Sequence, residues 1–227
     1  MRLRLDVLYT YDAKGRLLLS NEPIESARVP GPDLVLAVSN GQGIIRYGSN
    51  LPEELVDRLG AIPADRLLES GIAAYLETIE RELMPFGRWS RRGGPAYRFP
   101  SVPDFSEQAV EITEETRSVL TGQTRWLYDE YNCWGTAFAV LRNGVAVSTC
   151  FSSRLDDRSS EAGVWTDPDY RGQGFAGLVT QSWAAAVFAS GRIPFYSTSF
   201  DNMASQAVAG KLGLVQIGED FSWSRAD

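Results

Sequence analysis

The sequence predicts a mixed α/β fold with a core of ordinary size. Short apolar runs, such as residues 33–39 and 145–151, are typical of strands. Residues 64–84 instead place their apolar side chains at helical spacing. The 227 residues are 44% hydrophobic and 22% charged, as in soluble globular proteins. A chain of this length buries about 70% of its unfolded surface, so we expect one large domain or two small ones.

The first half of the chain predicts strands joined by turns, followed by two helices. Residues 3–9 alternate charged and apolar side chains, and the turn Asp12–Gly15 separates them from a returning strand. Pro52 suits the first turn of a helix, and the glutamates after it favour a helix N-terminus. We expect strands at 3–9, 16–19, 33–39 and 44–47, a helix that begins at Pro52–Glu54, and an amphipathic helix at 64–84.

The segment Arg91–Pro95 (RRGGP) interrupts these patterns, and two prolines follow within residues 99–103. We therefore place a boundary near residue 105. It separates an N-terminal α/β subdomain (1–105), whose role the sequence does not indicate, from a second domain (106–227).

The second half begins with a strong hairpin signal, because Asn143-Gly144 lies between two apolar runs. Gly213 favours the end of a helix. The order of elements is typical of a mixed α/β layer. We expect strands at 109–112, 136–141, 145–151, 161–166 and 193–199, and closing strands at 215–223. We expect one helix to begin at Thr113–Glu115 and three others to cover 125–131, 174–189 and 203–212.

The composition excludes several kinds of function. The 29 acidic and 22 basic residues give a net charge of −7, whereas a duplex-binding module needs a dense basic face, so we expect no nucleic-acid partner. A negative chain suits a cationic or amine partner better. The chain has no histidine, which excludes histidine general bases, histidine-activated nucleophiles and histidine-ligated metals. The pairs Asp156-Asp157 and Asp167/Asp169 lack further ligands at loop spacing, so we predict no metal site.

The cysteine content and the apolar runs predict a cytoplasmic location. Cys133 and Cys150 are the two cysteines, and we expect both to be reduced. The first residues lack the continuous apolar run of a signal peptide. The longest apolar stretch, 183–190, is too short to span a membrane.

Residues 161–177 (EAGVWTDPDYRGQGFAG) carry the strongest functional signal. A predicted strand ends at Thr166, and a glycine-rich turn then opens a long helix. Backbone amides and the positive end of the helix dipole converge at such a junction, which is typical of phosphate binding. The alternative is a tight turn in which Gly172 and Gly174 serve steric needs only.

The spacing Gly172-x-Gly174-x-x-Gly177 also fits the dinucleotide-binding fingerprint. In that fold, however, the glycine turn follows its strand almost directly, whereas here residues 167–171 intervene. Too few residues follow Gly177 to complete a dinucleotide-binding domain. We reject this interpretation.

The same segment resembles the acyl-CoA-binding motif of the GNAT superfamily of N-acetyltransferases, Arg/Gln-x-x-Gly-x-Gly/Ala. Arg171, Gly174 and Ala176 occupy the signature positions, preceded by the family's P-x-Y run at Pro168 and Tyr170. Residues 191–214 continue the resemblance, with an asparagine that opens the last helix and the ending KLGL. The similarity covers roughly 109–223; the first hundred residues match no family that we can name.

The resemblance implies a mostly antiparallel sheet flanked by helices, and transfer of an acetyl group from acetyl-CoA to a small-molecule or peptide amine. In such enzymes the strand at 161–166 splays away from the strand at 193–199, and the pantetheine arm lies in the gap. The amides of 171–176 would then hold the pyrophosphate, while a contact of the Arg171 side chain with phosphate stays open. The implied cofactor-binding residues are Val164, Trp165, Thr166, Arg171, Gly172, Gln173, Gly174, Phe175, Ala176, Asn202 and Ser205.

The resemblance also implies a catalytic base and leaves the acid open. Glu161 begins the strand that lines the cofactor slot, where many family members have a glutamate base; alternatively it pairs with Arg154 or Arg158. The amide of Val164 is the expected oxyanion donor. The family's tyrosine in the last helix corresponds to Ala209, so Tyr196, Ser199 or Ser205 would have to protonate the thiolate.

Other features keep two interpretations each. The aromatic cluster of Trp126, Tyr128, Tyr131 and Trp134 favours core packing over a cation–π wall for an amine. The basic run at 88–92 favours a solvated loop over a contact with phosphate or an anionic substrate tail. A non-catalytic acyl-CoA sensor is the alternative function. The sequence leaves open a homodimer, and an N-terminal half that is a degenerate second copy of the fold.

Overall fold

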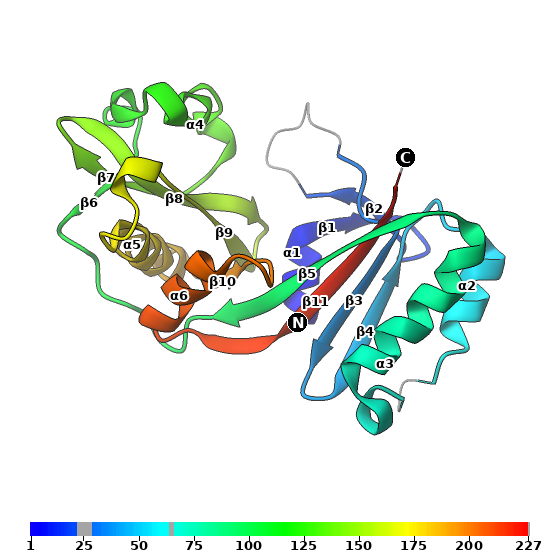
Figure 1. Cartoon of the computed structure of the whole chain (residues 1–227). Coiled ribbons are helices and arrows are strands. Elements are labelled where there is room, and N and C mark those ends of the chain that lie inside the picture. Colours follow the sequence, from blue (N-terminus) through cyan, green and yellow to red (C-terminus); the bar gives the residue numbers. More distant parts are fainter. Residues whose placement is uncertain (22–28, 64–65, 227) are drawn as a thin grey trace.

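The structure, a computed structural model, describes residues 1–21, 29–63 and 66–226. Figure 1 shows two groups of elements side by side, joined by the long strands β5 (Trp89–Arg98) and β11 (Val215–Arg225). One group contains helices α5 and α6, and the other contains α2 and α3. Within the described ranges, no helix is both long enough and apolar enough to cross a membrane.

Most of the strands form one sheet that runs through both groups. Its order is β4-β3-β11-β5-β10-β9-β8-β7-β6, nine strands among the described residues. All neighbours are antiparallel except β9 and β10. The predicted mixed, mostly antiparallel sheet is therefore confirmed. The other strands are β1 (Tyr9–Tyr11) paired with β2 (Leu17–Ser20), β3 (Leu34–Ser39), β4 (Gln42–Tyr47), β6 (Ala109–Glu111), β7 (Ala137–Arg142), β8 (Val145–Leu155), β9 (Ser159–Thr166) and β10 (Ile193–Ser197).

Helices cover both groups of strands and complete two main cores. Helix α5 packs on β7, β8 and β9, with Val179 and Trp183 fully buried. Helices α2 and α3 close a second core around Phe221 and Trp223 of β11. The helices are α1 (Arg2–Leu8), α2 (Glu53–Gly60), α3 (Arg66–Leu83), α4 (Arg125–Asp129), α5 (Phe175–Ala189) and α6 (Met203–Lys211), with 3₁₀ turns η1 (Met84–Phe86), η2 (Arg117–Val119), η3 (Gly122–Thr124), η4 (Tyr131–Cys133) and η5 (Pro168–Tyr170).

Most predicted elements are present. The hairpin between β7 and β8 turns at Asn143 and Gly144, whose φ angles of 51° and 76° suit an Asn-Gly turn. Both cysteines are free, as expected. The predicted long helix corresponds to α3, where Gly71 (φ 75°) interrupts the helical backbone; its predicted start at 64–65 lies outside the described residues.

The predicted strand at 3–9 is wrong, because residues 2–8 form helix α1. The alternating pattern counted Arg4 as a solvent-facing residue. In the structure Arg4 is 3% exposed, and Leu5 and Val7 are fully buried. The buried charge therefore gave the segment a false period of two.

The predicted break at Arg91–Pro95 is also wrong, since β5 passes straight through it. Gly93 and Gly94 lack side chains at positions where the backbone of other segments lies very close to β5. A Cβ atom on Gly94 would lie 1.7 Å from the carbonyl oxygen of Thr198. At this point the chain that follows β10 lies against β5, and the amide of Thr198 donates to Pro95 O.

No α-helix begins at Thr113–Glu115, contrary to expectation. Side chains of the two threonines there compete for the backbone. The Thr113 amide donates to Thr116 Oγ1 at 2.7 Å, and Thr116 Oγ1 donates to Glu111 O at 2.7 Å. This local bonding leaves only the 3₁₀ turn η2.

Tyr196 ties β10 to α6. Its side chain is buried, and its hydroxyl lies 2.7 Å from Ser205 Oγ and 3.3 Å from Ser205 O. Burial raises the pKa of Tyr196 to about 12, although the hydrogen bond with Ser205 acts in the opposite direction.

We predict that Gly94→Ala destabilises the protein by about 3 kcal/mol or more, because its new methyl group meets backbone atoms that cannot rotate away. Chemical denaturation measures the change. Gly210→Ala is the matched control: Gly210 lies in α6 with open space around it, so alanine there should stabilise by about 0.5–1 kcal/mol. Equal effects of the two substitutions would contradict the packing argument.

We predict that Tyr196 makes the fold less stable in alkali. The unfolded chain releases the phenolic proton near pH 10, whereas the folded protein keeps it until about pH 12. Stability is therefore complete below pH 10 and falls as the pH rises through this window. Between pH 9 and 11.5 the free energy of unfolding should fall by about 2 kcal/mol more in the wild type than in Tyr196→Phe. Urea denaturation at both pH values tests this, and a parallel fall in the two proteins would contradict it.

Candidate functional site

The parallel strands β9 and β10 pair only at their beginnings. Residues 159–161 of β9 pair with residues 193–195 of β10. Beyond Glu161, β9 keeps only β8 as a neighbour, while Tyr196 and Ser197 pair with β5. The strands therefore part after Glu161, as the family resemblance implied, and leave one edge of residues 162–166 without a partner strand among the described residues.

The exposed edge of β9 presents backbone groups of Val164 and Thr166. The Asp167 amide donates to Val147 O of the β8 strand, and Trp165 O accepts from Ser148 Oγ, so these groups point toward β8. Successive residues of a strand direct their amides to opposite edges. The amides of Val164 and Thr166 consequently point into the gap between β9 and β10.

A glycine turn connects β9 to α5 at the open end of the gap. Gly172 and Gly174 have φ angles of 78° and 83°, and a Cβ atom on either would meet nothing within 4 Å. Both glycines therefore serve the backbone conformation rather than close packing. Across this part of the described chain, the amides of 172–176 donate to no backbone carbonyl. These free amides lie at the N-terminus of a 15-residue helix, an arrangement that is typical of anion sites.

The side chains of the turn mostly stabilise it. Arg171 Nε donates to Thr166 O at 3.2 Å, so the arginine closes the turn against the end of β9. Thr166 Oγ1 lies 2.8 Å from Ser148 Oγ. Phe175 is buried, and the Arg142 guanidinium stacks 4.3 Å from its ring centroid. Only the backbone of Phe175 is therefore free to face a ligand. Gln173 lies in the turn, and Ala176 is the second residue of α5.

Asn202 and Ser205 organise the start of α6 on the other side of the gap. Asn202 Oδ1 accepts a hydrogen bond from the Ser205 amide at 3.0 Å and caps the helix. Ser205 Oγ contacts the Tyr196 hydroxyl, as described above. Ala209, one turn further along α6, is fully buried. Ser205 and Tyr196 therefore place their hydroxyl groups together beside α6. Ser199, the third candidate acid, lies in the loop before α6, where its carbonyl oxygen accepts from Gln206 Nε2 at 3.1 Å.

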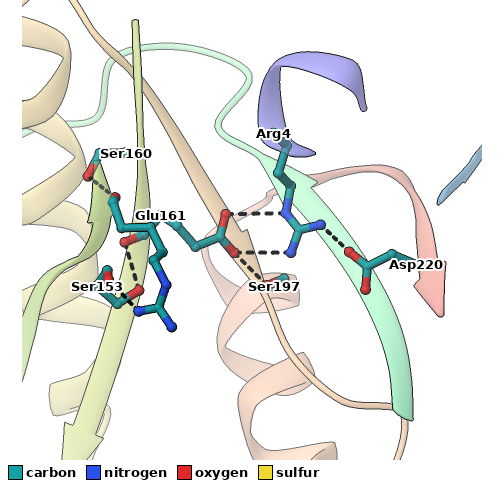
Figure 2. A network of polar contacts seen from close by, with 7 residues as sticks. Arg4, Ser153, Ser160, Glu161, Ser197 and Asp220 are labelled. Atoms are coloured by element: carbon teal, nitrogen blue, oxygen red, sulfur yellow. Dashed lines mark hydrogen bonds and ion pairs between the residues drawn. The ribbon is translucent and has the colours of Figure 1, made fainter. Parts of the chain in front are cut away.

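Glu161, the predicted base, lies at the vertex where the strands part, and it is 4% exposed. Figure 2 shows its carboxylate facing the guanidinium of Arg4 from α1. Arg4 Nε donates to Oε2 at 3.2 Å and Nη2 to Oε1 at 3.4 Å, while Ser197 Oγ of β10 donates to Oε1 at 2.5 Å.

Arg4 is the residue that sequence reasoning missed. Its third nitrogen, Nη1, forms an ion pair with Asp220 of β11. Burial disfavours the charged guanidinium, but the charges and hydrogen bonds of Glu161 and Asp220 outweigh burial and raise the pKa of Arg4. Arg158, which the sequence offered as a partner of Glu161, instead bonds Asp6 at 3.2 Å. The sequence signal for this buried ion pair was the position of Arg4 between Leu3 and Leu5.

The remaining features belong to packing. The rings of Trp126 and Trp134 lie 5.3 Å and 4.8 Å from that of Phe151. Trp134 is buried, which supports the predicted core role for it, whereas Trp126 is exposed. Arg117 stacks over the ring of Tyr128. Of the basic run, Arg91 bonds Glu80 on α3 at 2.7 Å. In the described ranges, no group of three or more acidic or cysteine side chains is placed to hold a metal.

The fold and this site can be set beside known proteins. The GNAT acetyltransferase family model matches residues 106–219. The chain is 32% identical over 117 residues to the uncharacterized N-acetyltransferase YdfB of Bacillus subtilis (strain 168); the match covers 48% of this chain and 44% of YdfB, so it spans less than half of that relative.

Among solved structures, the fold is similar to that of a GCN5-related N-acetyltransferase-like protein from Streptococcus suis 89/1591. The TM-score is 0.51 at 17% identity, over 85% of this chain and 84% of the other. This similarity includes the mixed sheet, and the family match spans the parted strands and the glycine turn. The chain belongs to the GNAT acetyltransferase family.

Proposed function

We propose that the protein transfers an acetyl group from acetyl-CoA to the amine of a small molecule or peptide. The observation that carries this proposal is the gap between β9 and β10, which opens beside the free amides of 172–176. An extended pantetheine arm fits a strand edge, and a pyrophosphate fits a helix N-terminus. Family membership supports the same chemistry.

In this proposal the backbone holds the cofactor. The amides of 172–176 bind the phosphates, and the edge of residues 162–166 hydrogen-bonds the pantetheine as an added strand would. The amide of Val164 points into the gap and donates to the oxygen that becomes negative during transfer. Asn202 and Ser205 border the arm from the side of α6.

The acceptor must lose a proton before it attacks the thioester, since an alkylamine is protonated at neutral pH. The chain has no histidine, and Glu161 is the carboxylate at the vertex of the gap. We assign it as the base, acting directly or through one water. The amine nitrogen then bonds to the acetyl carbon, the carbon–sulfur bond breaks, and the thiolate takes a proton.

The hydroxyl pair of Tyr196 and Ser205 is our assignment for that last proton. Ser205 Oγ borders the gap, and the Tyr196 hydroxyl lies 2.7 Å from Ser205 Oγ. Because Tyr196 stays protonated up to about pH 12, it can keep Ser205 hydrogen-bonded at any physiological pH. We place the reaction in the cytoplasm, where the two free cysteines would remain reduced.

Ala209 favours one alternative, a protein that binds acyl-CoA without turnover. It removes the hydroxyl that many GNAT enzymes have at this position. Binding of acetyl-CoA without acetylation of any amine in a broad panel would support the sensor.

We predict that wild-type protein binds acetyl-CoA and that Gly174→Ala binds it about tenfold or more weakly. Alanine at a φ of 83° costs about 1–2 kcal/mol, which the turn can relieve only by moving its amides apart. Gly144→Ala is the matched control, because Gly144 has a φ of 76° and open surroundings but lies in the hairpin between β7 and β8. Isothermal titration calorimetry measures both affinities. No heat with wild-type protein at millimolar acetyl-CoA would end both the enzyme and the sensor proposals.

We predict that Glu161→Gln lowers kcat for amine acetylation about 100-fold or more, because the amide cannot accept the amine proton. Its affinity for acetyl-CoA should stay within about threefold, since the phosphates lie on the glycine turn. Glu80→Gln makes the same chemical change at an exposed ion pair with Arg91 and should leave kcat unchanged. Thiol release gives the rates. A Glu161→Gln enzyme with full activity from pH 6 to 9 would rule out Glu161 as the base.

A further inference from the structure

The contact between Arg4 and Glu161 joins the two halves of the chain at the proposed reaction centre. Ala162 and Val164 of β9 pack against the core under α5. Side chains alternate along a strand, so Glu161 points to the opposite face of the sheet. Helix α1 packs on β8 and β9 and supplies Arg4 at that face. The N-terminal half therefore covers the carboxylate from the side that α5 leaves free.

The guanidinium is fixed on both sides. Two of its nitrogens, Nε and Nη2, contact Glu161, and the third, Nη1, contacts Asp220. Each guanidinium nitrogen therefore has a carboxylate partner. The side chains of Arg4, Glu161 and Asp220 are 3%, 5% and 24% exposed. Such a fork holds a carboxylate in one plane and one direction, which a lysine cannot do.

We propose that Arg4 is a positioning residue for acetyl transfer: it holds the Glu161 carboxylate toward the gap, with Asp220 fixing Arg4 from behind. The proposal rests on the proposed acetyltransferase function. It makes α1, and through it the first half of the chain, part of the reaction centre. Arg4 itself touches neither acetyl-CoA nor the acceptor and acts only through Glu161.

The test compares steady-state kinetics of the full chain, with acetyl-CoA and the amine that the wild type acetylates fastest in a panel. Arg4→Met should lower kcat about 100-fold while the KM for acetyl-CoA stays within about threefold. Arg4→Lys restores the charge but not the fork and should recover about tenfold of that loss. Should Arg4→Met fail to fold with two unpaired carboxylates, Arg4→Lys carries the test, with kcat about tenfold below wild type.

Two further variants separate positioning from a structural role. Asp6→Asn removes the surface ion pair between α1 and Arg158 and leaves the triad intact, so kcat should not change. The double variant Arg4→Met/Glu161→Gln should be no slower than Glu161→Gln alone, since both changes affect one proton transfer. A merely structural Arg4 would instead multiply the two losses.

The outcomes are distinct. A folded Arg4→Met enzyme with wild-type kcat, or a double variant that shows the full product of the single losses, overturns the positioning role while the acetyltransferase proposal stands. A wild type that binds acetyl-CoA and acetylates no amine overturns the proposed function, and the role of Arg4 falls with it.

Discussion

The parting of β9 from β10 is the constraint on which the rest of the structure depends. Two parallel strands that hydrogen-bond along their whole length would leave no free backbone edge between them. Here β10 pairs with β9 only over residues 193–195, while the opposite edge of β10 pairs with β5 over residues 195–197. The parting places Glu161 at the vertex, with Ser197 across from it. The free edge of β9 and the position of the carboxylate thus both follow from this short pairing.

Most elements of both halves follow from local sequence, and the segments that do not are fixed by distant partners. The hairpin at Asn143-Gly144 and the turn at Gly172–Gly174 need positive φ angles that few residues other than glycine and asparagine adopt, so the letters alone predict them. Helix α1 was mispredicted because its most informative residue, Arg4, is buried by partners 157 and 216 positions away. No periodicity within a short window contains that information.

The candidate site divides in the same way. Its backbone part, from Val164 to Ala176, could be placed from the motif and from the strand–turn–helix order. Its side-chain part could not, since the contacts of Glu161 come from α1 and β10 and the hydroxyl beside Ser205 comes from β10. Side chains that meet across a sheet are set by its register. That register depends here on β5, in which the sequence analysis wrongly predicted a break at RRGGP.

The position of β5 also has a consequence for how the chain folds. Arg98 pairs with Val215, so the middle of the sheet closes only after more than a hundred further residues have been added. At about 5–20 residues per second, synthesis leaves this strand without its neighbours for about 5–20 seconds. Pairing over such separations is slow, and an unpaired strand invites aggregation. Charged residues and proline in an unpaired strand disfavour its pairing with another chain. In β5 these residues are Arg91, Arg92 and Pro95.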